Sequence, residues 1–378
     1  MRVLLMPASY PPELGGVQTV SAALATYLHD GGHAVRVLTN RYPRTLPSSE
    51  VLDKVPVDRL PFLAPARRQL RAHRPDLFLA ALYCYPAAAR RLHRIVREFE
   101  PDVINVHFPV AMNSFVLRLR RHHPTRLVVS LHGDDVLGFG RRTPAEQRAF
   151  VAILRAADHL TACSAFLLDQ ARSIEPSIDA KSEVIHNGVD LMRFASPSGP
   201  VRRRRYVLSY GRQTFDKGCD LLIDAFTVVA PRFPDVDLLL AGDGVERSRL
   251  EQQAIDRGLT GRVTFYGRAS PAQVVELLDD CELAVFPRRS EPFGIVALEA
   301  MAAGKAVLAT SVGGLPEILP HPPNRLVEPT SEALAGALTD WLARPEDLRA
   351  AGIANRHNAA GYTWERALTS FERALAVR

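Results

Sequence analysis

The chain has little lysine, few cysteines and no long apolar run. Its four cysteines are widely spaced and form no CxxC pair, so we expect neither a disulfide nor a cysteine-held metal. No run of about 18 apolar residues is present, which argues against a membrane-spanning helix. The start, "MRVLLMPASYPPELGG", reads as a buried strand followed by a turn rather than as a secretion signal. Together these features favour a reduced, cytoplasmic setting.

The scarcity of lysine makes this a chain whose positive charge comes almost entirely from arginine. Its net charge is +6, from 47 cationic and 41 acidic residues. The arginine excess is compatible with a GC-rich genome, or with a polyanionic ligand or an anionic membrane surface. Nucleic-acid binding would rest only on this basicity and on "RRRR" at 202–205, and we do not expect it. The lysines are Lys54, Lys181, Lys217 and Lys305.

The pattern of strands and helices predicts two α/β domains in tandem. The length of 378 residues exceeds one comfortable core. Short apolar strands alternate with helices along both halves, which is typical of a parallel sheet covered on both faces. The Pro-, Ser- and Arg-rich stretch "ASPSGPVRRRRY" (195–206) separates the halves. We therefore expect doubly wound, Rossmann-like domains at 1–195 and 196–362, facing a central cleft, with a hinge near 195–205.

Four sequence features lie at the ends of predicted strands, where ligands bind in doubly wound sheets. In the first half the strands are expected at 2–9, 34–40, 102–107 and 126–133, with "HLTACS" and "SEVIHNGVD" continuing the pattern. In the second half they are expected at 206–211, 237–244, 263–267, 283–287 and 306–310.

Two of these features lie in the N-terminal half. Gly15-Gly16 precede a predicted helix at 17–32, where backbone N–H groups could face a phosphate, although such a pair is often only a turn. His132 ends the strand in "LHGDD", and could act as a general base, position a ligand, or simply be a satisfied histidine. A metal would need three or four converging ligands, and the tandem aspartates would diverge, so we expect none.

The other two features lie in the C-terminal half. In "YGRQTFDKG", Arg212 follows a strand and Lys217 precedes a helix, an arrangement suited to a diphosphate unless both are ordinary solvated cations. In "SEPFGIVALEAMAAG", Gly294 opens a helix with no evident polar face, yet Glu299 lies within it. A carboxylate there needs a partner if it does not reach water. A ribose diol would suit it.

The order and spacing of these motifs carry a family resemblance. "GGVQ", "LHGDD", "VIHNGVD", "GRQTFDKG", "AGDG", "EPFGIVALEA" and "GLPEIL" extend over nearly the whole chain. The chain resembles the retaining glycosyltransferases of family 4, which have the two-domain glycosyltransferase-B architecture. The specific element is the E-x7-E pair with its intervening "FG"; the other motifs are individually weak. In this architecture the last helix, here 363–378, often crosses back to the N-terminal domain.

The resemblance implies a role for each site residue. Arg212 and Lys217 would hold the donor diphosphate, Glu291 the sugar hydroxyls and Glu299 the ribose, with His132 beside the sugar. The remaining donor-binding positions that it implies are Gly15, Gly16, Gly211, Gly242, Gly267, Arg268, Phe293, Gly294 and Ile295. Gly267 and Arg268 would lie at the base. No cofactor and no metal are expected, because fixed cations and helix N-termini would stabilise the leaving diphosphate.

The resemblance also implies a front-face reaction in which the leaving phosphate accepts the acceptor's proton; Glu291 as a covalent nucleophile is the minor alternative. A sugar-nucleotide epimerase and a non-catalytic sugar-nucleotide binding protein remain rival functions. The acceptor is a small molecule or a lipid-linked one. The basic segment 59–98 is compatible with peripheral contact with the inner face of a membrane, or with two amphipathic helices packed on the sheet. Either a monomer or a homodimer is expected.

Overall fold

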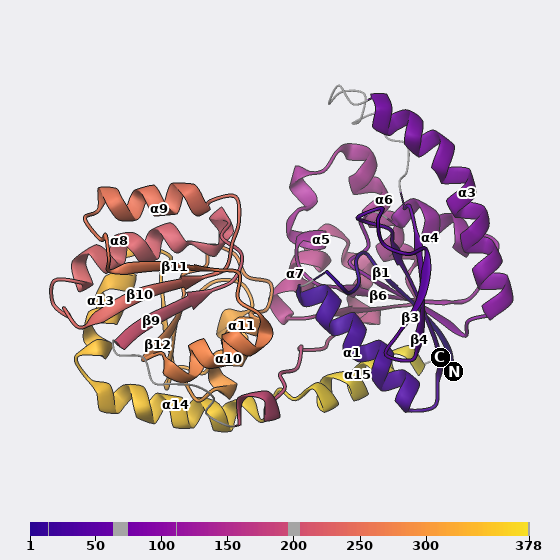
Figure 1. Cartoon of the computed structure of the whole chain (residues 1–378). Coiled ribbons are helices and arrows are strands. Elements are labelled where there is room, and N and C mark those ends of the chain that lie inside the picture. The colour runs from indigo at the N-terminus through magenta and orange to yellow at the C-terminus, as the bar shows by residue number, and fades with distance from the viewer. Residues whose placement is uncertain (14, 63–74, 111, 196–204, 377–378) are drawn as a thin grey trace. The chain divides into compact units, whose positions relative to one another are not determined.

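The chain folds as two compact α/β units, seen in a computed structural model that describes all residues except 14, 63–74, 111, 196–204 and 377–378 (Figure 1). Unit 1 contains Met1–His186 and Glu365–Arg378, and unit 2 contains Asn187–Trp364. The division falls nine residues before the predicted boundary at 195. The reason is local: the Val189 N–H donates to the Tyr362 carbonyl (2.8 Å), and Val189 pairs with Thr363 in an isolated parallel bridge. The predicted hinge segment lies largely outside the described residues.

Unit 1 is built on an eight-stranded sheet in the order β3-β4-β2-β1-β5-β6-β7-β8. All neighbouring pairs are parallel except β3 and β4. The strands are β1 (Arg2–Pro7), β2 (Ala34–Asn40), β3 (Ser49–Leu52), β4 (Val55–Leu60), β5 (Val103–His107), β6 (Arg126–Leu131), β7 (His159–Ala162) and β8 (Ser182–Val184). The central strands are buried, as expected for a parallel sheet covered on both faces.

The helices of unit 1 begin where the sequence supplies start signals. Thr143 caps α6 in a capping box with Glu146, and Pro144 occupies its first turn. The last helix packs on this unit: Glu372 contacts His33 (2.7 Å), and Arg126 donates to the Ala374 carbonyl (3.1 Å). The helices are α1 (Gly16–Asp30), α3 (Pro75–Phe99), α4 (Asn113–Arg120), α5 (Asp134–Leu137), α6 (Pro144–Ala156), α7 (Ala165–Ile174) and α15 (Trp364–Ala376), with the 3-10 turns η1 (Phe139–Arg141) and η2 (Pro176–Lys181).

The hairpin β3–β4 was not predicted. Its turn consists of Asp53 and Lys54, both with positive φ (47° and 68°), a conformation that the sequence signals less clearly here than Asn-Gly would. Segment 59–98 therefore contains the end of this hairpin and the 25-residue helix α3. Residues 63–74 of that segment lie outside the described residues. Evidence on whether the segment contacts a membrane or only packs on the sheet therefore comes from the exposed face of α3.

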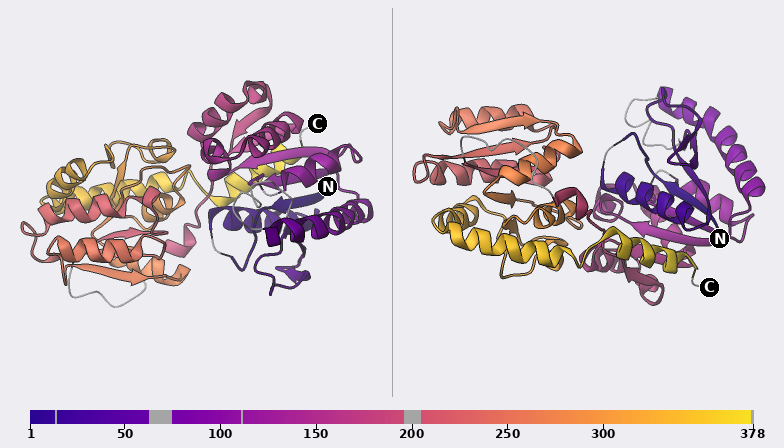
Figure 2. Two further views of the ribbon diagram at one scale, coloured as in Figure 1. Left: turned by 90° about the horizontal axis from the view of Figure 1, so that it is seen from above. Right: turned by 60° about the horizontal axis from the view of Figure 1, so that its bottom comes forward.

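Unit 2 is built on a six-stranded parallel sheet in the order β11-β10-β9-β12-β13-β14 (Figure 2). Its strands are β9 (Arg205–Tyr210), β10 (Val236–Ala241), β11 (Val263–Gly267), β12 (Leu283–Phe286), β13 (Val307–Thr310) and β14 (Arg325–Val327). Its helices are α8 (Cys219–Val229), α9 (Arg247–Asp256), α10 (Pro271–Asp280), α11 (Ile295–Ala302), α12 (Leu315–Ile318), α13 (Ser331–Leu342) and α14 (Pro345–Ala359), with the turns η3 (Met192–Phe194) and η4 (Phe215–Lys217).

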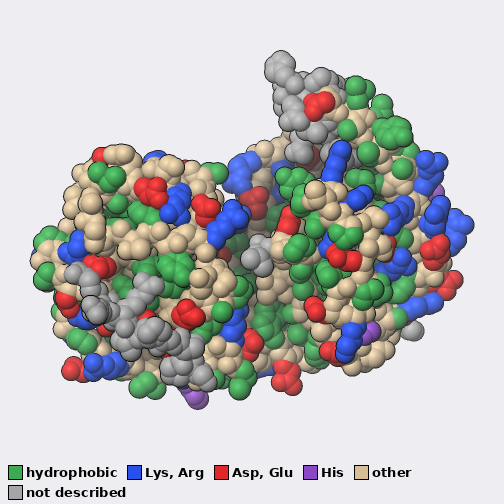
Figure 3. Space-filling model, in the orientation of Figure 1, with side chains coloured by type: hydrophobic (Ala, Val, Ile, Leu, Met, Phe, Trp, Pro, Cys, Tyr) green, Lys and Arg blue, Asp and Glu red, His purple; other side chains and the backbone are tan. Residues whose placement is uncertain are grey.

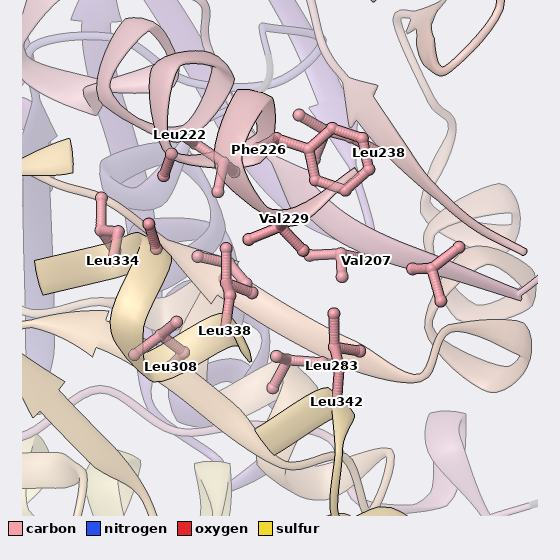
Figure 4. Close-up of a cluster of buried hydrophobic side chains, with 14 of the residues drawn as sticks. Val207, Leu222, Phe226, Val229, Leu238, Leu283, Leu308, Leu334, Leu338 and Leu342 are labelled. Atoms are coloured by element: carbon pink, nitrogen blue, oxygen red, sulfur yellow. The ribbon is translucent and has the colours of Figure 1, made fainter. Parts of the chain in front are cut away.

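The core of unit 2 explains why its strands read as continuous apolar runs. Alternate strand residues such as Val207 and Leu283 pack against α8 and α13 (Figure 4). The intervening residues, such as Leu208 and Ala284, are also fully buried. Since successive strand side chains point to opposite faces, both faces of this sheet are covered. The loops beyond the strand ends are therefore where the polar groups predicted for the site lie.

Candidate functional site

The carboxyl edge of the unit 2 sheet is shaped by glycines. Gly211 (φ 131°) directly follows β9 and Gly242 (φ 129°) directly follows β10, both in conformations that favour glycine. The Gly211 N–H donates to Ala241 (3.0 Å) and the Gly242 N–H donates to Gly267 (2.7 Å), so each loop is tied to the next strand. A Cβ on Gly242 would overlap the Gly211 carbonyl oxygen. These glycines bring backbone close together at the edge where the predicted donor residues lie.

Lys217 and Glu291 meet at this edge. Lys217 Nζ donates to Glu291 Oε2 over 3.0 Å, and both side chains are only 13% exposed. Gly218 makes this possible: its φ is 66°, and a Cβ there would overlap the Pro287 carbonyl oxygen just after β12. The loop after β9 and the loop after β12, which are 74 residues apart in sequence, therefore supply opposite charges to one place.

Arg288 is a buried cation beside the same carboxylate, and sequence reasoning missed it. Its Nε lies 3.7 Å from Glu291 Oε2 and its Nη2 donates to the Tyr210 carbonyl (2.9 Å), with the side chain 3% exposed. Glu291 thus faces two cations, Lys217 and Arg288. The neighbouring Arg289 instead forms a two-point pair with Asp220 (2.7 Å each). "RRS" before Glu291 was the available signal, but it does not say which arginine is buried.

Arg212 is the exposed cation of the group. It follows Gly211 directly after β9, and its guanidinium makes no hydrogen bond or ion pair to any residue that the structure describes. Lys217 lies on the same loop, five residues later. Because the Arg212 guanidinium has no partner among the described residues, it is available to bind an anionic ligand.

Glu299 has a partner within the protein, which the sequence interpretation did not foresee. Tyr210 Oη lies 3.0 Å from Glu299 Oε2 and 2.7 Å from the Val296 carbonyl oxygen. Desolvation raises the pKa of Glu299 above its ordinary value and raises the pKa of Tyr210 well above 10. The Tyr210 hydroxyl thus faces both the Glu299 carboxyl group and a main-chain carbonyl oxygen.

The remaining predicted donor positions surround this group within unit 2. Gly294 (φ 106°) precedes α11, the half-buried Ile295 is its first residue, and the Phe293 side chain is buried. Gly267 ends β11, and Arg268 is exposed and pairs with Asp243 of the "AGDG" loop (3.2 Å).

In unit 1, His132 follows β6 and contacts a second histidine at the end of β5. His132 Nε2 lies 2.9 Å from His107 Nδ1, and the two rings are stacked. Burial lowers the pKa of His132 to about 4, and it also lowers the pKa of His107 well below its ordinary value, where the neighbouring His132 adds a second contribution. His132 is therefore a neutral, partly exposed imidazole at neutral pH. His107 was not predicted, although "VINVH" ends in it.

The other unit 1 predictions concern the loops next to His132 and α1. Asp135 is buried and accepts the N–H groups of His132 and Gly133, whereas Asp134 is exposed and pairs with Arg141. The two carboxylates thus have different hydrogen-bond partners. Across the described ranges, no three His, Cys, Asp or Glu side chains are grouped so that they could hold a metal. Gly15 and Gly16 are exposed at the start of α1, where Gly15 is extended (φ 164°).

The fold and these strand-end groups define a two-domain glycosyltransferase-B protein. The chain superimposes on sucrose-phosphate synthase of Thermosynechococcus elongatus with a TM-score of 0.78, at 23% identity and with 98% of this chain and 97% of that chain covered. A structure of Anabaena HepE in complex with UDP also gives a TM-score of 0.78, at 21% identity over 100% of both chains. The predicted architecture is therefore confirmed.

The family follows from sequence similarity. Residues 14–193 match the family described as Glycosyltransferase Family 4, and residues 194–358 match Glycosyl transferases group 1. The chain is 31% identical over 379 residues to the GDP-mannose-dependent alpha-(1-6)-phosphatidylinositol monomannoside mannosyltransferase of Mycolicibacterium smegmatis, covering 94% of this chain and 93% of the relative. The chain belongs to glycosyltransferase family 4, as the motifs predicted.

Proposed function

We propose that the protein transfers a sugar from a nucleotide-diphosphate sugar to an acceptor with retention of anomeric configuration. The observation that carries the proposal is the contact of Lys217 with Glu291 at the edge where Arg212 is exposed. It joins a carboxylate suited to sugar hydroxyls with cations suited to a diphosphate. Cations fixed in this way need little reorganisation when negative charge develops on the leaving group.

The proposed reaction is a front-face displacement. The bond from the anomeric carbon to the diphosphate oxygen breaks, and a bond from that carbon to the acceptor forms on the same face. The acceptor's proton passes to the leaving phosphate oxygen, so no protein nucleophile is required. Arg212, Lys217 and the backbone N–H groups around Gly294 would stabilise the diphosphate, while Glu291 orients the sugar.

The other site residues are assigned by position. Glu299 would bind the ribose from α11, and Gly267 and Arg268 would lie at the base, with Gly211 and Gly242 lining the phosphate side. His132 and Gly16 would contribute from unit 1 when the donor is bound. We propose that no metal cofactor is needed. Full transfer activity in EDTA is the expected result, and loss that is restored by a divalent cation would contradict it.

A UDP-sugar or a GDP-sugar is the proposed donor. The related HepE structure contains UDP, and the mycolicibacterial relative is named as GDP-mannose-dependent, so each base has support. The test is a thermal-shift and hydrolysis screen with UDP-, GDP-, dTDP- and ADP-sugars. We expect one nucleotide class to raise the melting temperature and to be hydrolysed slowly. Epimerised donor without transfer, or binding with no turnover under any acceptor, would contradict the proposal.

The exposed face of α3 favours a lipid-linked acceptor over a soluble small-molecule acceptor. In the first half of this helix, Leu79, Leu82 and Tyr83 are 63%, 55% and 85% exposed. In its second half the exposed face carries Arg90, Arg94 and Arg97. Figure 3 shows hydrophobic side chains near the start of α3 and basic ones further along it. Apolar side chains beside arginines suit an anionic lipid surface.

No helix in the described ranges is long and apolar enough to cross a bilayer. The contact that we propose is peripheral. Co-sedimentation with vesicles containing anionic lipid, at low salt, tests this version. We expect binding that salt weakens and that Tyr83→Ser combined with Leu79→Ser reduces. Absence of binding to anionic vesicles would leave the soluble acceptor, without affecting the donor screen.

A further inference from the structure

A chain of buried polar side chains crosses the interior of the unit 1 sheet and ends at His132. Asn105 and His107 of β5, Ser130 of β6 and Thr161 of β7 are each at most 1% exposed, in strands whose other buried residues are apolar. Thr161 Oγ1 contacts Ser130 Oγ (3.0 Å), and Asn105 Nδ2 donates to the same hydroxyl (3.0 Å). Buried polar groups are costly unless hydrogen-bonded, so a satisfied chain of this length calls for an explanation.

The direction of the chain is set at Asn105. Its Nδ2 also donates to the Val128 carbonyl oxygen (3.3 Å), which can only accept. The amide oxygen of Asn105 therefore faces His107, and His107 Nε2 lies 2.6 Å from it. An amide oxygen accepts only, so this assignment places a proton on Nε2 of His107.

The tautomer of His107 determines the tautomer of His132. With Nε2 protonated and the buried ring neutral, Nδ1 of His107 is an acceptor. His132 Nε2, 2.9 Å away, must then be the donor. The proton of His132 is thus on Nε2, and its Nδ1 has a lone pair. Nδ1 makes no hydrogen bond to any residue in the described ranges.

The surroundings do not supply a competing charge to this pair. The ring of Phe371 on α15 lies 6.1 Å from that of His107, and Cys163 Sγ lies 3.7 Å from the main-chain oxygen of His132. Asp135 holds the backbone N–H of His132 rather than its ring. Arg142 binds the main-chain oxygens of Asp134 and Asp135.

We propose that Asn105 and His107 are positioning residues that hold His132 as the Nε2–H tautomer, with Nδ1 as a hydrogen-bond acceptor at the end of β6. His132 would then accept a hydrogen bond from a sugar hydroxyl and would not donate one to the donor's phosphate. This consequence rests on the proposed glycosyl transfer. The tautomer itself does not.

The first test is the nitrogen NMR of the whole protein labelled with ¹⁵N-histidine, near pH 7 and without ligand. His132 is assigned by the resonances that disappear in His132→Gln. We expect Nδ1 of His132 at an unprotonated, pyridine-type shift and Nε2 at a protonated, pyrrole-type shift. The opposite tautomer, or a ring protonated on both nitrogens, overturns the inference even if the protein transfers sugar.

Variants of His107 test its positioning role. His107→Leu removes the acceptor, so His132 should populate both tautomers and the transfer rate should fall by about tenfold or more. His107→Gln can still accept through Oε1, and should restore the tautomer and most of the rate. Thr161→Val, at the far end of the chain, is the matched control and should leave the tautomer unchanged.

A fall in rate in His107→Leu with the His132 tautomer unchanged would assign His107 a merely structural role. If His107→Leu does not fold, the spectrum of the unsubstituted protein still decides the assignment. If no donor is ever turned over, the proposed function fails while the tautomer remains measurable. The two failures are therefore distinguishable.

Discussion

The carboxyl edges of the two sheets are both formed by parallel strands, but they differ in chemistry. In unit 2 the edge holds ions: Lys217 contacts Glu291 at 3.0 Å, Arg288 lies behind them and Arg212 is exposed. In unit 1 the edge holds a neutral ring, His132, at the end of a buried polar chain. A parallel sheet thus fixes where ligand groups gather, and the loops decide whether they are charged.

The contrast suits ligand groups of different charge, an anionic group at the unit 2 edge and an uncharged group at the unit 1 edge. Fixed cations near a diphosphate stabilise the charge that a leaving group acquires, whereas a neutral acceptor can hold a hydroxyl without attracting the phosphates. The unit 2 edge also depends on glycines that allow backbone to touch backbone. Substitutions can separate the shape of that edge from its charge and its hydrogen bonds, and other substitutions can test the neutral edge.

The largest effect is expected for Gly218→Ala. A Cβ at Gly218 would overlap the Pro287 carbonyl oxygen, so the loops carrying Lys217 and Glu291 would have to move apart. We expect the free energy of unfolding to fall by about 3 kcal/mol, measured by chemical denaturation. Gly258→Ala is the matched control: its φ of 70° resembles the 66° of Gly218, but no atom lies near its Cβ.

Gly258→Ala should cost only the strain of a left-handed alanine, about 1–2 kcal/mol. Equal losses in the two variants would mean that the close approach at Gly218 adds nothing, and the unit 2 edge would then not depend on backbone contact.

The charge of the edge is tested by Arg212→Ala and Lys217→Ala. Each should reduce transfer by tenfold or more, which corresponds to about 1.4 kcal/mol of transition-state stabilisation. Steady-state kinetics with the donor found in the screen measures this loss. Arg232→Ala, an exposed arginine just before β10, is the control and should have near-normal kinetics. Near-normal turnover in both Arg212→Ala and Lys217→Ala would remove the diphosphate role.

The sequence named more residues at this edge than at the other one, for a physical reason. Arg212, Lys217 and Glu291 lie in loops that follow strands, and loops at the carboxyl edge of one parallel sheet lie close together. Periodicity likewise located most strands and the helix α11 around Glu299. Arg288 was missed because the sequence does not distinguish the buried arginine of "RRS" from its neighbour, which pairs with Asp220.

Other features depend on contacts distant in sequence. Asn105, Ser130 and Thr161 interrupt apolar strands, which is a signal, but only the register of β5, β6 and β7 brings them into one chain. The same holds for the unit boundary, since Val189 joins unit 2 through Tyr362 and Thr363. Composition marked residues 195–206 instead, because a Pro- and Arg-rich stretch resembles a linker.

The hydrogen bonds of the unit 2 edge are tested by Glu299→Gln. If the carboxyl group binds the ribose, donor affinity should weaken by several-fold, about 1 kcal/mol, with a smaller effect on the rate at saturating donor. Isothermal titration with the free nucleotide diphosphate measures it. Tyr210→Phe is the companion variant, because it removes the protein partner and leaves the carboxyl group. If Glu299→Gln leaves donor affinity unchanged and both variants lose stability, Glu299 has a structural role through Tyr210 and does not bind the ribose.

The smallest effect concerns the neutral edge and its response to acid. The pKa of His132 is lowered by burial to about 4, from 6.5 for a free histidine. Between these values the unfolded chain binds a proton that the folded one does not, so this group makes stability fall as pH drops through that window. Asp135 acts oppositely, because burial raises its pKa to about 6, and its contribution to stability is lost as pH rises toward that value.

His107 acts in the same direction as His132, since its pKa is also lowered. Two histidines that gain protons on unfolding outweigh one carboxyl group that loses one, so the melting temperature should fall from pH 6.5 to pH 4.5. His132→Gln removes one titrating ring and should reduce the slope of melting temperature against pH. His159→Gln, which loses a histidine paired with Glu183 at the edge of the same sheet, is the control and should not reduce it. Parallel slopes for the unsubstituted protein and His132→Gln would show that His132 is protonated in the folded state, and the neutral edge would then be charged like its counterpart in unit 2.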